Sequence, residues 1–133
     1  MLVPVTINDA AFLYNMLKER TPEMSISFQM PTFEYHCKFL VDCPYEAWYI
    51  IFEKGERLGN IYLTKKDEVG YFIKKEYQGQ GYCRKAFKEL TKKHPRKHYY
   101  ANVNPRNKNG IRFVEKLGGK LVQLTYKITN KNT

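Results

Sequence analysis

The chain has 133 residues, which is enough for one globular domain and too few for two. Hydrophobic residues make up 43% of it and no apolar run is long, so a disordered chain and a transmembrane helix are both excluded. The net charge of +10 favours an anionic partner, either a polyphosphate cofactor or a nucleic acid, although a solvated basic surface accounts for the same charge.

The N-terminus and the cysteines indicate the compartment. The stretch "MLVPVTINDA" lacks the basic region and the long apolar region of a signal peptide. Cys37, Cys43 and Cys83 are odd in number and form no CxxC motif, so we interpret them as free thiols. We therefore expect a cytoplasmic protein with no membrane partner.

The N-terminal elements have recognisable boundaries. Residues 2–5 are typical of a short edge strand, because Pro4 cannot donate to a ladder. Thr6 and Asp9 have the spacing of a capping box, which predicts that a helix begins there. Thr32 has the character of a second N-cap. The two helices are expected over residues 6–20 and 32–41.

The pattern then changes to strands. The runs 48–53, 57–64 and 69–74 are rich in aromatic and β-branched residues and are joined by short turns, which predicts an antiparallel meander. After them come a helix beginning near Cys83, a strand, a second helix and a last strand. The last three are expected over residues 99–103, 107–119 and 121–128.

This order predicts a mixed α/β domain that covers residues 1–133. Its central mixed sheet has about six strands and four flanking helices. The antiparallel meander comes first, and a parallel β-α-β crossover then joins strand 69–74 to strand 99–103.

The stretch "YQGQGYC", residues 77–83, stands where a strand ends and a helix begins. Such a junction has unpaired N–H groups and the positive end of a helix dipole, so it suits an anion. Gly79 and Gly81 keep side chains away from those amides. No Gly-Lys-Ser/Thr follows, and Arg84 replaces the third glycine of a dinucleotide motif. A plain turn remains the alternative to a phosphate-binding loop.

Two blocks resemble the GNAT superfamily of N-acetyltransferases. Residues 78–83 are similar to its acyl-CoA pyrophosphate loop, Gln/Arg-x-x-Gly-x-Gly/Ala, with Cys83 at the last position. "VNPRNKNGIRFVEKLGGK", residues 103–120, looks like its second block, and the likeness extends over about residues 2–128. The resemblance implies acetyl-CoA as the donor, with CoA as a product.

The resemblance also implies a set of cofactor contacts. Loop amides and the Gln78 side chain would hold the pyrophosphate, and the backbone of Phe72 and Ile73 would pair with the pantetheine arm. Asn107 would approach from the next helix, and Arg84 and Lys85 would meet an outer phosphate, unless the two belong to a solvated helix face. The implied contacts are Phe72, Ile73, Gln78, Gly79, Gln80, Gly81, Tyr82, Cys83, Arg84 and Asn107.

For catalysis, the resemblance makes Glu68 the candidate base, since it opens the strand that leads to the loop. An exposed turn carboxylate is the alternative interpretation. Val114 occupies the position where many members have a tyrosine acid, and Phe113 beside it cannot donate a proton. Tyr82 and Tyr100 are therefore the candidate acids, or the thiolate leaves without one.

The acceptor is expected to be a primary amine, either of a small molecule such as an amino sugar, amino acid or polyamine, or of a protein N-terminus. Residues 21–33 and the last strand would line it, and a homodimer is considered because the family generally has one further strand. A non-catalytic CoA-binding or regulatory protein is the alternative, and a nucleic-acid-binding module is less favoured. No metal is expected, since Pro95 separates His94 from His98.

Overall fold

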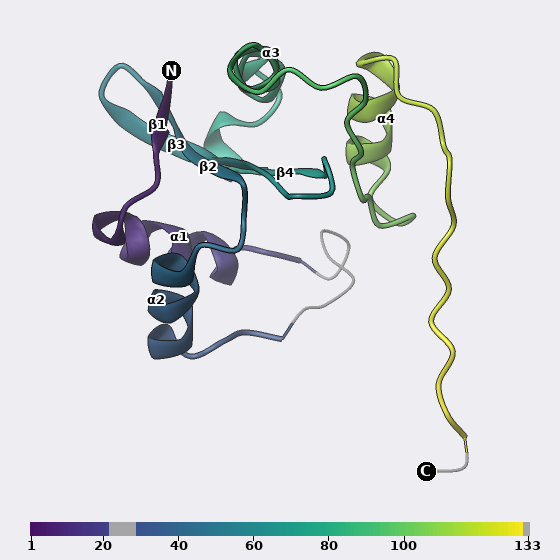
Figure 1. Cartoon of the computed structure of the whole chain (residues 1–133), viewed down its shortest axis with the longest axis horizontal. Coiled ribbons are helices and arrows are strands. Elements are labelled where there is room, and N and C mark those ends of the chain that lie inside the picture. The colour runs from purple at the N-terminus through teal and green to yellow at the C-terminus, as the bar shows by residue number, and fades with distance from the viewer. Residues whose placement is uncertain (22–28, 132–133) are drawn as a thin grey trace.

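The computed structural model describes residues 1–21 and 29–131. The strands of this part form a single antiparallel sheet in the order β1-β2-β3-β4 (Figure 1). Each strand pairs with the next along the chain, as the meander pattern predicted. The strands are β1 (Leu2–Pro4), β2 (Ala47–Glu53), β3 (Glu56–Leu63) and β4 (Val69–Ile73).

Helices cover both faces of this sheet (Figure 1). Helices α1 and α2 lie on one face, α3 lies on the other, and α4 stands beyond β4. Two short 3-10 helices, η1 and η3, precede α1 and the glycine loop. The bounds are η1 (Ile7–Asp9), α1 (Ala10–Lys18), α2 (Phe33–Asp42), η3 (Lys75–Tyr77), α3 (Tyr82–Lys93) and α4 (Lys108–Lys116).

Local chemistry sets several of these boundaries. Thr6 and Asp9 form the capping box expected from their spacing, and Thr32 accepts a hydrogen bond from the N–H of Tyr35 at 3.2 Å. Lys54 and Gly55 join β2 to β3 with φ angles of 51° and 79°. Two consecutive positive φ angles match the twist of a tight hairpin, so this turn fixes the register of the two longest strands.

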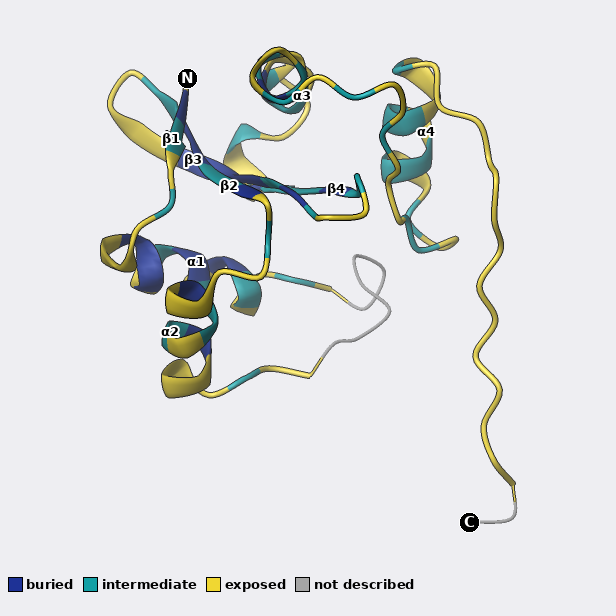
Figure 2. Ribbon diagram, viewed as in Figure 1, coloured by how far each residue is buried: buried dark blue, intermediate teal, exposed yellow. Residues whose placement is uncertain are grey.

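The core has two parts because successive residues of a strand point to opposite faces. Ile51 packs with Leu58 and Leu90 on the α3 side. Its neighbour Ile50 packs with Leu13 and Leu40 beneath α1 and α2. Figure 2 shows the buried residues along the sheet and on the helix faces turned toward it. The sheet is therefore packed by apolar side chains on both of its faces.

The six-strand sheet and the parallel crossover are not found. Residues 99–103 form no strand, and a single parallel bridge joins Tyr100 to Glu68. A turn follows in which Asn104 accepts hydrogen bonds from the N–H groups of Arg106 and Asn107, and it leads the chain away from β4. Residues 121–128 are extended and exposed, and they pair with no described strand. Apolar and polar residues alternate in this segment as they do in a strand, but no described strand lies beside it.

None of the helices in the described ranges has the length and apolarity needed to cross a bilayer.

Substitution of Leu90 tests the packing of the core on the α3 side of the sheet. It is fully buried between α3 and the sheet, so Leu90→Ala leaves a cavity and is expected to lower the free energy of unfolding by about 2–5 kcal/mol. Urea unfolding followed by circular dichroism measures this. Lys88→Ala, two residues earlier at an exposed position, is the control and should change stability by less than about 0.5 kcal/mol. Equal losses in the two variants would contradict this packing.

Candidate active site

The glycine loop between η3 and α3 has a backbone that requires glycine. Gly79 and Gly81 have φ angles of +77° and +86°, and Gly81 is the residue that precedes the first turn of α3. A Cβ atom at either position would meet nothing within 4 Å. Conformation rather than crowding therefore demands glycine at these two positions, and the absent side chains leave the loop surface open.

This loop presents a run of free amide donors. In the described part of the chain, no hydrogen bond uses the backbone N–H groups of residues 79–84. The N–H of Lys85 is the first that is used, and it donates to the carbonyl of Gly81 at 3.1 Å. Free amides at the positive end of a helix bind anions, and here several of them follow one another without interruption.

Two glutamine side chains hold the loop in place. Gln78 donates from Nε2 to the carbonyl of Ile73 at 2.9 Å, and Gln80 donates to the carbonyl of Glu76 at 3.0 Å. Both side chains therefore turn back toward the sheet and η3. They brace the loop, while its backbone amides stay available to a ligand.

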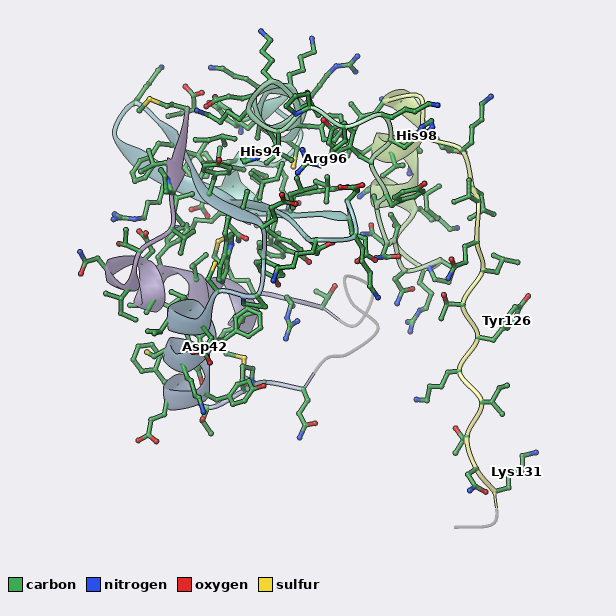
Figure 3. All side chains as sticks on the ribbon, in the orientation of Figure 1. Asp42, His94, Arg96, His98, Tyr126 and Lys131 are labelled. Atoms are coloured by element: carbon green, nitrogen blue, oxygen red, sulfur yellow. The ribbon has the colours of Figure 1, made fainter. Side chains whose placement is uncertain are left out.

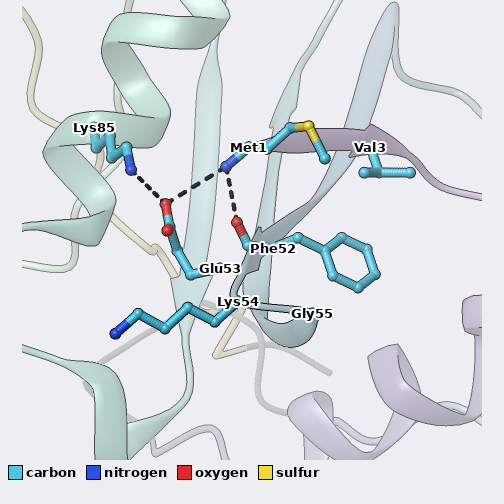
Figure 4. Close-up of a pocket in the computed structure, with 7 residues that line it drawn as sticks. All are labelled: Met1, Val3, Phe52, Glu53, Lys54, Gly55 and Lys85. Atoms are coloured by element: carbon cyan, nitrogen blue, oxygen red, sulfur yellow. Dashed lines mark hydrogen bonds and ion pairs between the residues drawn. The ribbon is translucent and has the colours of Figure 1, made fainter.

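The first turn of α3 contributes one free cation. The side chain of Arg84 is exposed and has no ion pair or hydrogen bond within the residues described. Lys85 is different, because its Nζ lies 2.6 Å from Oε1 of Glu53 (Figure 4). Of these two neighbours, Arg84 is therefore the one that is free to meet a phosphate beside the loop.

Glu53 also belongs to a hollow of about 460 Å³ at the β2–β3 hairpin (Figure 4). Its carboxylate lies 3.6 Å from the terminal ammonium of Met1, which also donates to the carbonyl of Phe52 at 2.8 Å. Lys85 holds the pKa of Glu53 below its usual range through a hydrogen bond. The carboxylate of Glu53 is therefore already paired with two cations, Met1 and Lys85, and is not a free acid or base for a substrate.

Strand β4 has one open edge. Val69 donates to the carbonyl of Tyr100 at 2.7 Å, and Tyr100 donates to the carbonyl of Asp67 at 2.9 Å. Alternate residues of a strand in an antiparallel ladder direct their polar groups to the same edge, so Tyr71 and Ile73 face the same side as Val69. Phe72 faces β3. Of the two residues expected to meet the pantetheine arm, only Ile73 has its backbone N–H at the open edge.

Glu68 lies at the start of this edge and is held by two side chains. Its Oε2 accepts a hydrogen bond from Asn102 at 2.8 Å, and its Oε1 accepts one from Thr64 at 3.2 Å. The residue is half-buried. Its carboxylate is thus fixed in position, unlike that of a freely solvated turn residue. Asn102 was missed from the sequence, because 34 residues separate it from Glu68.

The two candidate tyrosine acids lie at different ends of β4. Tyr100 is bridged to Glu68 through the backbone. Tyr82 opens α3, where its ring meets that of Tyr77 at 6.3 Å. Since β4 has five residues, the two ends are about 17 Å apart at ~3.4 Å per residue. The structure therefore brings Tyr100, and not Tyr82, to the neighbourhood of Glu68.

The second block supports the same edge from α4. Asn107 caps this helix by accepting from the N–H of Gly110 at 2.9 Å. Phe113 meets the ring of Tyr71 edge to face at 5.3 Å. Burial raises the pKa of Tyr71 to about 12, so its phenol stays protonated at neutral pH and can donate a hydrogen bond beside the open edge. Tyr71 looks like an ordinary strand residue in the sequence, which is why it was missed.

His94 and His98 lie in different surroundings. The ring Nε2 of His94 and the hydroxyl of Tyr49 are 2.6 Å apart, and Figure 3 places His94 beneath α3 and His98 toward α4. Across residues 1–21 and 29–131, no three His, Cys, Asp or Glu side chains gather in a way that would hold a metal ion.

Comparison with known proteins identifies the family. The model of the acetyltransferase (GNAT) family matches residues 13–119, so the chain belongs to this family. Members of the family use acetyl-CoA as the acyl donor, as the resemblance implied. No curated protein matches the chain by sequence.

Solved structures show the same fold. An acetyltransferase from Thermus thermophilus has a TM-score of 0.73 at 23% identity, covering 92% of this chain and 88% of that one. The ribosomal-protein-alanine N-acetyltransferase of Brucella melitensis biovar Abortus 2308 has a TM-score of 0.70 at 12% identity, covering 98% and 99%. YncA, a putative acetyltransferase from Salmonella typhimurium with its cofactor acetyl-CoA, has a TM-score of 0.69 at 14% identity, covering 89% and 78%.

Cys83 provides a test of how α3 packs behind the loop. Burial raises the pKa of its thiol to about 12, so about 1 molecule in 10,000 carries the reactive thiolate at pH 8. Exposed Cys43 is expected to be alkylated by iodoacetamide at least 100-fold faster. The difference between the two alkylation rates should narrow as the pH rises toward 12, because the thiolate of Cys83 then becomes populated.

Mass spectrometry of tryptic peptides measures the two rates. In 6 M guanidinium chloride both thiols should react at similar rates, which is the control for peptide detection. Equal rates in the folded protein at pH 8 would show that Cys83 is not buried behind the loop.

Proposed function

We propose that this protein is an N-acetyltransferase that transfers the acetyl group of acetyl-CoA to a primary amine. The observation that carries the proposal is the run of unused amides at residues 79–84, beside the unpaired Arg84. Together they suit a pyrophosphate with a further phosphate nearby. The free thiols of Cys37, Cys43 and Cys83 are consistent with action in a reducing cytoplasm.

The open edge of β4 continues from this loop toward Glu68. The outward N–H of Ile73 suits the amide groups of the pantetheine arm, since extended peptide-like groups pair readily with a free strand edge. In this arrangement the arm lies along β4 and brings the thioester to the end of the strand that carries Glu68. The thioester supplies an activated acyl group, and the protein positions it.

Glu68 is proposed as the base for the acceptor. An alkylamine with a pKa near 10.4 is neutral in about 1 molecule in 2,500 at pH 7, so removal of its proton is a real barrier. A carboxylate fixed by Asn102 and Thr64 is well placed to take that proton directly or through a water. The amine nitrogen then attacks the acyl carbon, the bond from that carbon to sulfur breaks, and the second proton lost by the nitrogen goes to the departing thiolate.

A small amine is the proposed acceptor class, and a protein N-terminus is the second candidate. The ribosomal-protein-alanine N-acetyltransferase with the same fold supports the second candidate. Of the segment expected to line the acceptor, residues 22–28 lie outside the described residues. The other expected part, residues 121–128, is detached from the sheet and leaves the acceptor side open.

Binding of acetyl-CoA tests the loop assignment. Isothermal titration calorimetry is expected to show binding to the wild type and at least 100-fold weaker binding to Gly81→Glu, because a carboxylate would stand among the anion-binding amides. Free ATP serves as the anion control and should bind more weakly than acetyl-CoA to the wild type.

Gly55→Glu is the matched control for this substitution. Gly55 also has a positive φ, +79°, and a Cβ there also meets nothing within 4 Å, so charge and backbone strain change in the same way at the β2–β3 turn, outside the glycine loop. It should keep full affinity for acetyl-CoA. Equal, weak binding of ATP and acetyl-CoA in all three proteins would mean that the glycines merely turn the chain.

Replacement of Glu68 tests the chemistry apart from donor binding. Glu68→Gln is expected to lower kcat for an alkylamine acceptor by about 10²–10⁴-fold while affinity for acetyl-CoA is kept. Asp67→Asn is the control, because Asp67 pairs with Arg96 at 3.0 Å and asparagine tolerates its positive φ of 62°. The rates are measured as thiol release at saturating acetyl-CoA. A Glu68→Gln enzyme with the kcat of the wild type would contradict the role of Glu68 as the base.

A further inference from the structure

The side chain of Tyr62 on β3 lies across β4. Tyr62 pairs with Gly70 in the register of the two strands. A Cβ atom placed on Gly70 would stand 2.0 Å from Cζ of Tyr62 and 2.2 Å from its hydroxyl oxygen. The end of the phenol ring therefore rests on the bare backbone of β4, and the missing side chain of Gly70 makes the room for it.

This phenol belongs to the face of the sheet that α1 and α2 cover (Figure 1). The neighbours of Tyr62 along β3, Ile61 and Leu63, pack in the core on the α3 side, so Tyr62 between them points to the opposite face. Trp48, which pairs with it from β2, packs against the core beneath α1 and α2. The segment that joins these two helices was expected to line the acceptor. The hydroxyl of Tyr62 therefore lies on the side from which an acceptor is expected to arrive.

Glu68, the candidate base, lies on the same face as Tyr62. It stands two residues before Gly70, and Thr64 stands two residues after Tyr62, so the two positions continue the pairing of the strands. The N–H of Thr64 donates to the carbonyl of Glu68 at 2.8 Å, and Oγ1 of Thr64 donates to Oε1 of Glu68 at 3.2 Å. The carboxylate and the phenol are thus neighbours on one face of β4.

Tyr45 holds the phenol of Tyr62 in place. The two rings are stacked, with centroids 4.0 Å apart and 7° between their planes. The ring of Trp48 meets that of Tyr45 edge to face at 5.0 Å. The hydroxyl of Tyr45 donates a hydrogen bond to that of Tyr62, while the Tyr62 hydroxyl donates none within the residues described. The proton of Tyr62 is therefore available to a ligand.

The surroundings of Tyr62 influence its acidity in opposite directions. Burial raises its pKa above the usual value, so the hydroxyl keeps its proton at neutral pH. The charge of Glu68 adds to this rise in pKa, whereas the hydrogen bond from Tyr45 and the charge of Arg20 oppose it. Such a phenol is protonated at rest, and its oxygen is still stabilised when the proton moves to another atom.

The reaction needs a proton for the departing thiolate, and α4 does not supply one at the positions examined in the sequence, Phe113 and Val114. We propose that Tyr62 is the catalytic acid of this enzyme, a role that rests on the proposed function. After the attack, the amine nitrogen and the thioester sulfur are bonded to the same carbon, so one hydroxyl can contact both. This arrangement lets a single side chain serve the two proton transfers that complete the reaction.

The atoms balance in this step. The bond from carbon to sulfur breaks, and its electron pair stays on the sulfur. The sulfur takes the hydroxyl proton of Tyr62, and the oxygen of Tyr62 takes the second proton from the nitrogen. Tyr62 ends the step as it began, while the first proton of the amine remains on Glu68 until it passes to water.

The other tyrosines near the open edge of β4 are less suited to this role. Tyr82 lies at the far end of the strand from Glu68. Tyr71 packs against Phe113 of α4, on the opposite face of the sheet. The side chain of Tyr100 is 46% exposed. Of these four, Tyr62 is the one that combines a packed ring with a position beside Glu68.

Tyr62→Phe removes the hydroxyl and keeps the ring on Gly70. It is expected to lower kcat with acetyl-CoA by about 10²–10⁴-fold, while calorimetry shows the wild-type affinity for acetyl-CoA. Tyr49→Phe is the matched control and should keep the wild-type kcat. It also removes a tyrosine hydroxyl from the sheet, but on the α3 side, where that hydroxyl lies 2.6 Å from Nε2 of His94. A loss of kcat in Tyr100→Phe with none in Tyr62→Phe would overturn the proposal.

A donor with a better leaving group separates an acid from a residue that only supports the structure. A thiol of lower pKa leaves faster and has less need of a proton. With the acetyl thioester of an aromatic thiol, kcat/KM of Tyr62→Phe should therefore come within about tenfold of the wild-type value. An equal loss with this donor and with acetyl-CoA would overturn the role of Tyr62 as an acid.

The complex with CoA gives a readout that does not depend on turnover. A hydroxyl that donates to the sulfur stabilises the thiolate form of CoA, so the pKa of the bound thiol should be about one unit lower in the wild type than in Tyr62→Phe. The ultraviolet absorbance of the thiolate, followed as the pH is raised and corrected with the spectrum of the protein alone, measures this pKa. The same pKa in the two complexes would overturn the contact between Tyr62 and the sulfur.

Gly70→Ala tests the placement of the ring without removing the hydroxyl. The added Cβ would displace the end of Tyr62 from β4, so kcat is expected to fall by at least about tenfold. In the Tyr62→Phe background the same substitution should cost much less, because no hydroxyl is left to displace. Circular dichroism should show that every variant is folded. Losses that simply add in the double variant would overturn the placement of the acid over Gly70.

The two proposals fail in different ways. A wild-type protein that binds CoA but acetylates no amine would remove the proposed function, and the titration of the bound thiol would still decide whether Tyr62 contacts the sulfur. An active enzyme whose Tyr62→Phe variant keeps the wild-type kcat would remove the role of Tyr62 and leave the proposed function standing.

Discussion

The site depends on one backbone bridge, the hydrogen bond of 2.7 Å from Val69 to Tyr100. It holds the segment after α3 against β4 at one point, and the turn at Asn104 then leads the chain away. Ladder pairing continued along β4 would use the outward groups of Tyr71 and Ile73 within the sheet. Because pairing stops after one bridge, the outward groups of Tyr71 and the N–H of Ile73 remain open to a ligand, while the carbonyl of Ile73 accepts from Gln78 and Asn102 is still brought to Glu68. The binding edge is thus the part of β4 that lies beyond the point where strand pairing is interrupted.

Electrostatics and backbone geometry act together at the other end of this edge. Every fully exposed side chain of α3 is basic, and Lys85 is the one of them with a described ion pair. The exposed residues are Arg84, Lys85, Lys88, Lys92 and Lys93. Lys92 and Lys93 stabilise the helix by facing the negative end of its dipole. Arg84 lies at the opposite end and adds its charge to that of the loop amides. The surplus of +10 is therefore partly explained by the exposed residues of one helix, which attract a polyphosphate.

The sequence predicted what local patterns encode. The capping box at Thr6, the N-cap at Thr32 and the tight turn before β3 are confirmed, because each depends on residues that are adjacent or one turn apart. The strands at 99–103 and 121–128 were wrong, since alternation reports an amphipathic segment and says nothing about a neighbour with which to pair. The hydrogen bond from Asn102 to Glu68 joins residues far apart in the chain, so no local signal reveals it.

The two edges of the sheet are treated differently, and this difference explains why the site lies at β4. An exposed strand edge invites pairing with other chains, and proteins normally block it. The edge at β1 is short and carries Pro4, and the neighbouring pair of strands has a bulge at Ile51 and Phe52. The edge at β4 has no proline and no bulge among its described residues. The edge at β4 is therefore left unblocked, and its half near the glycine loop suits the donor.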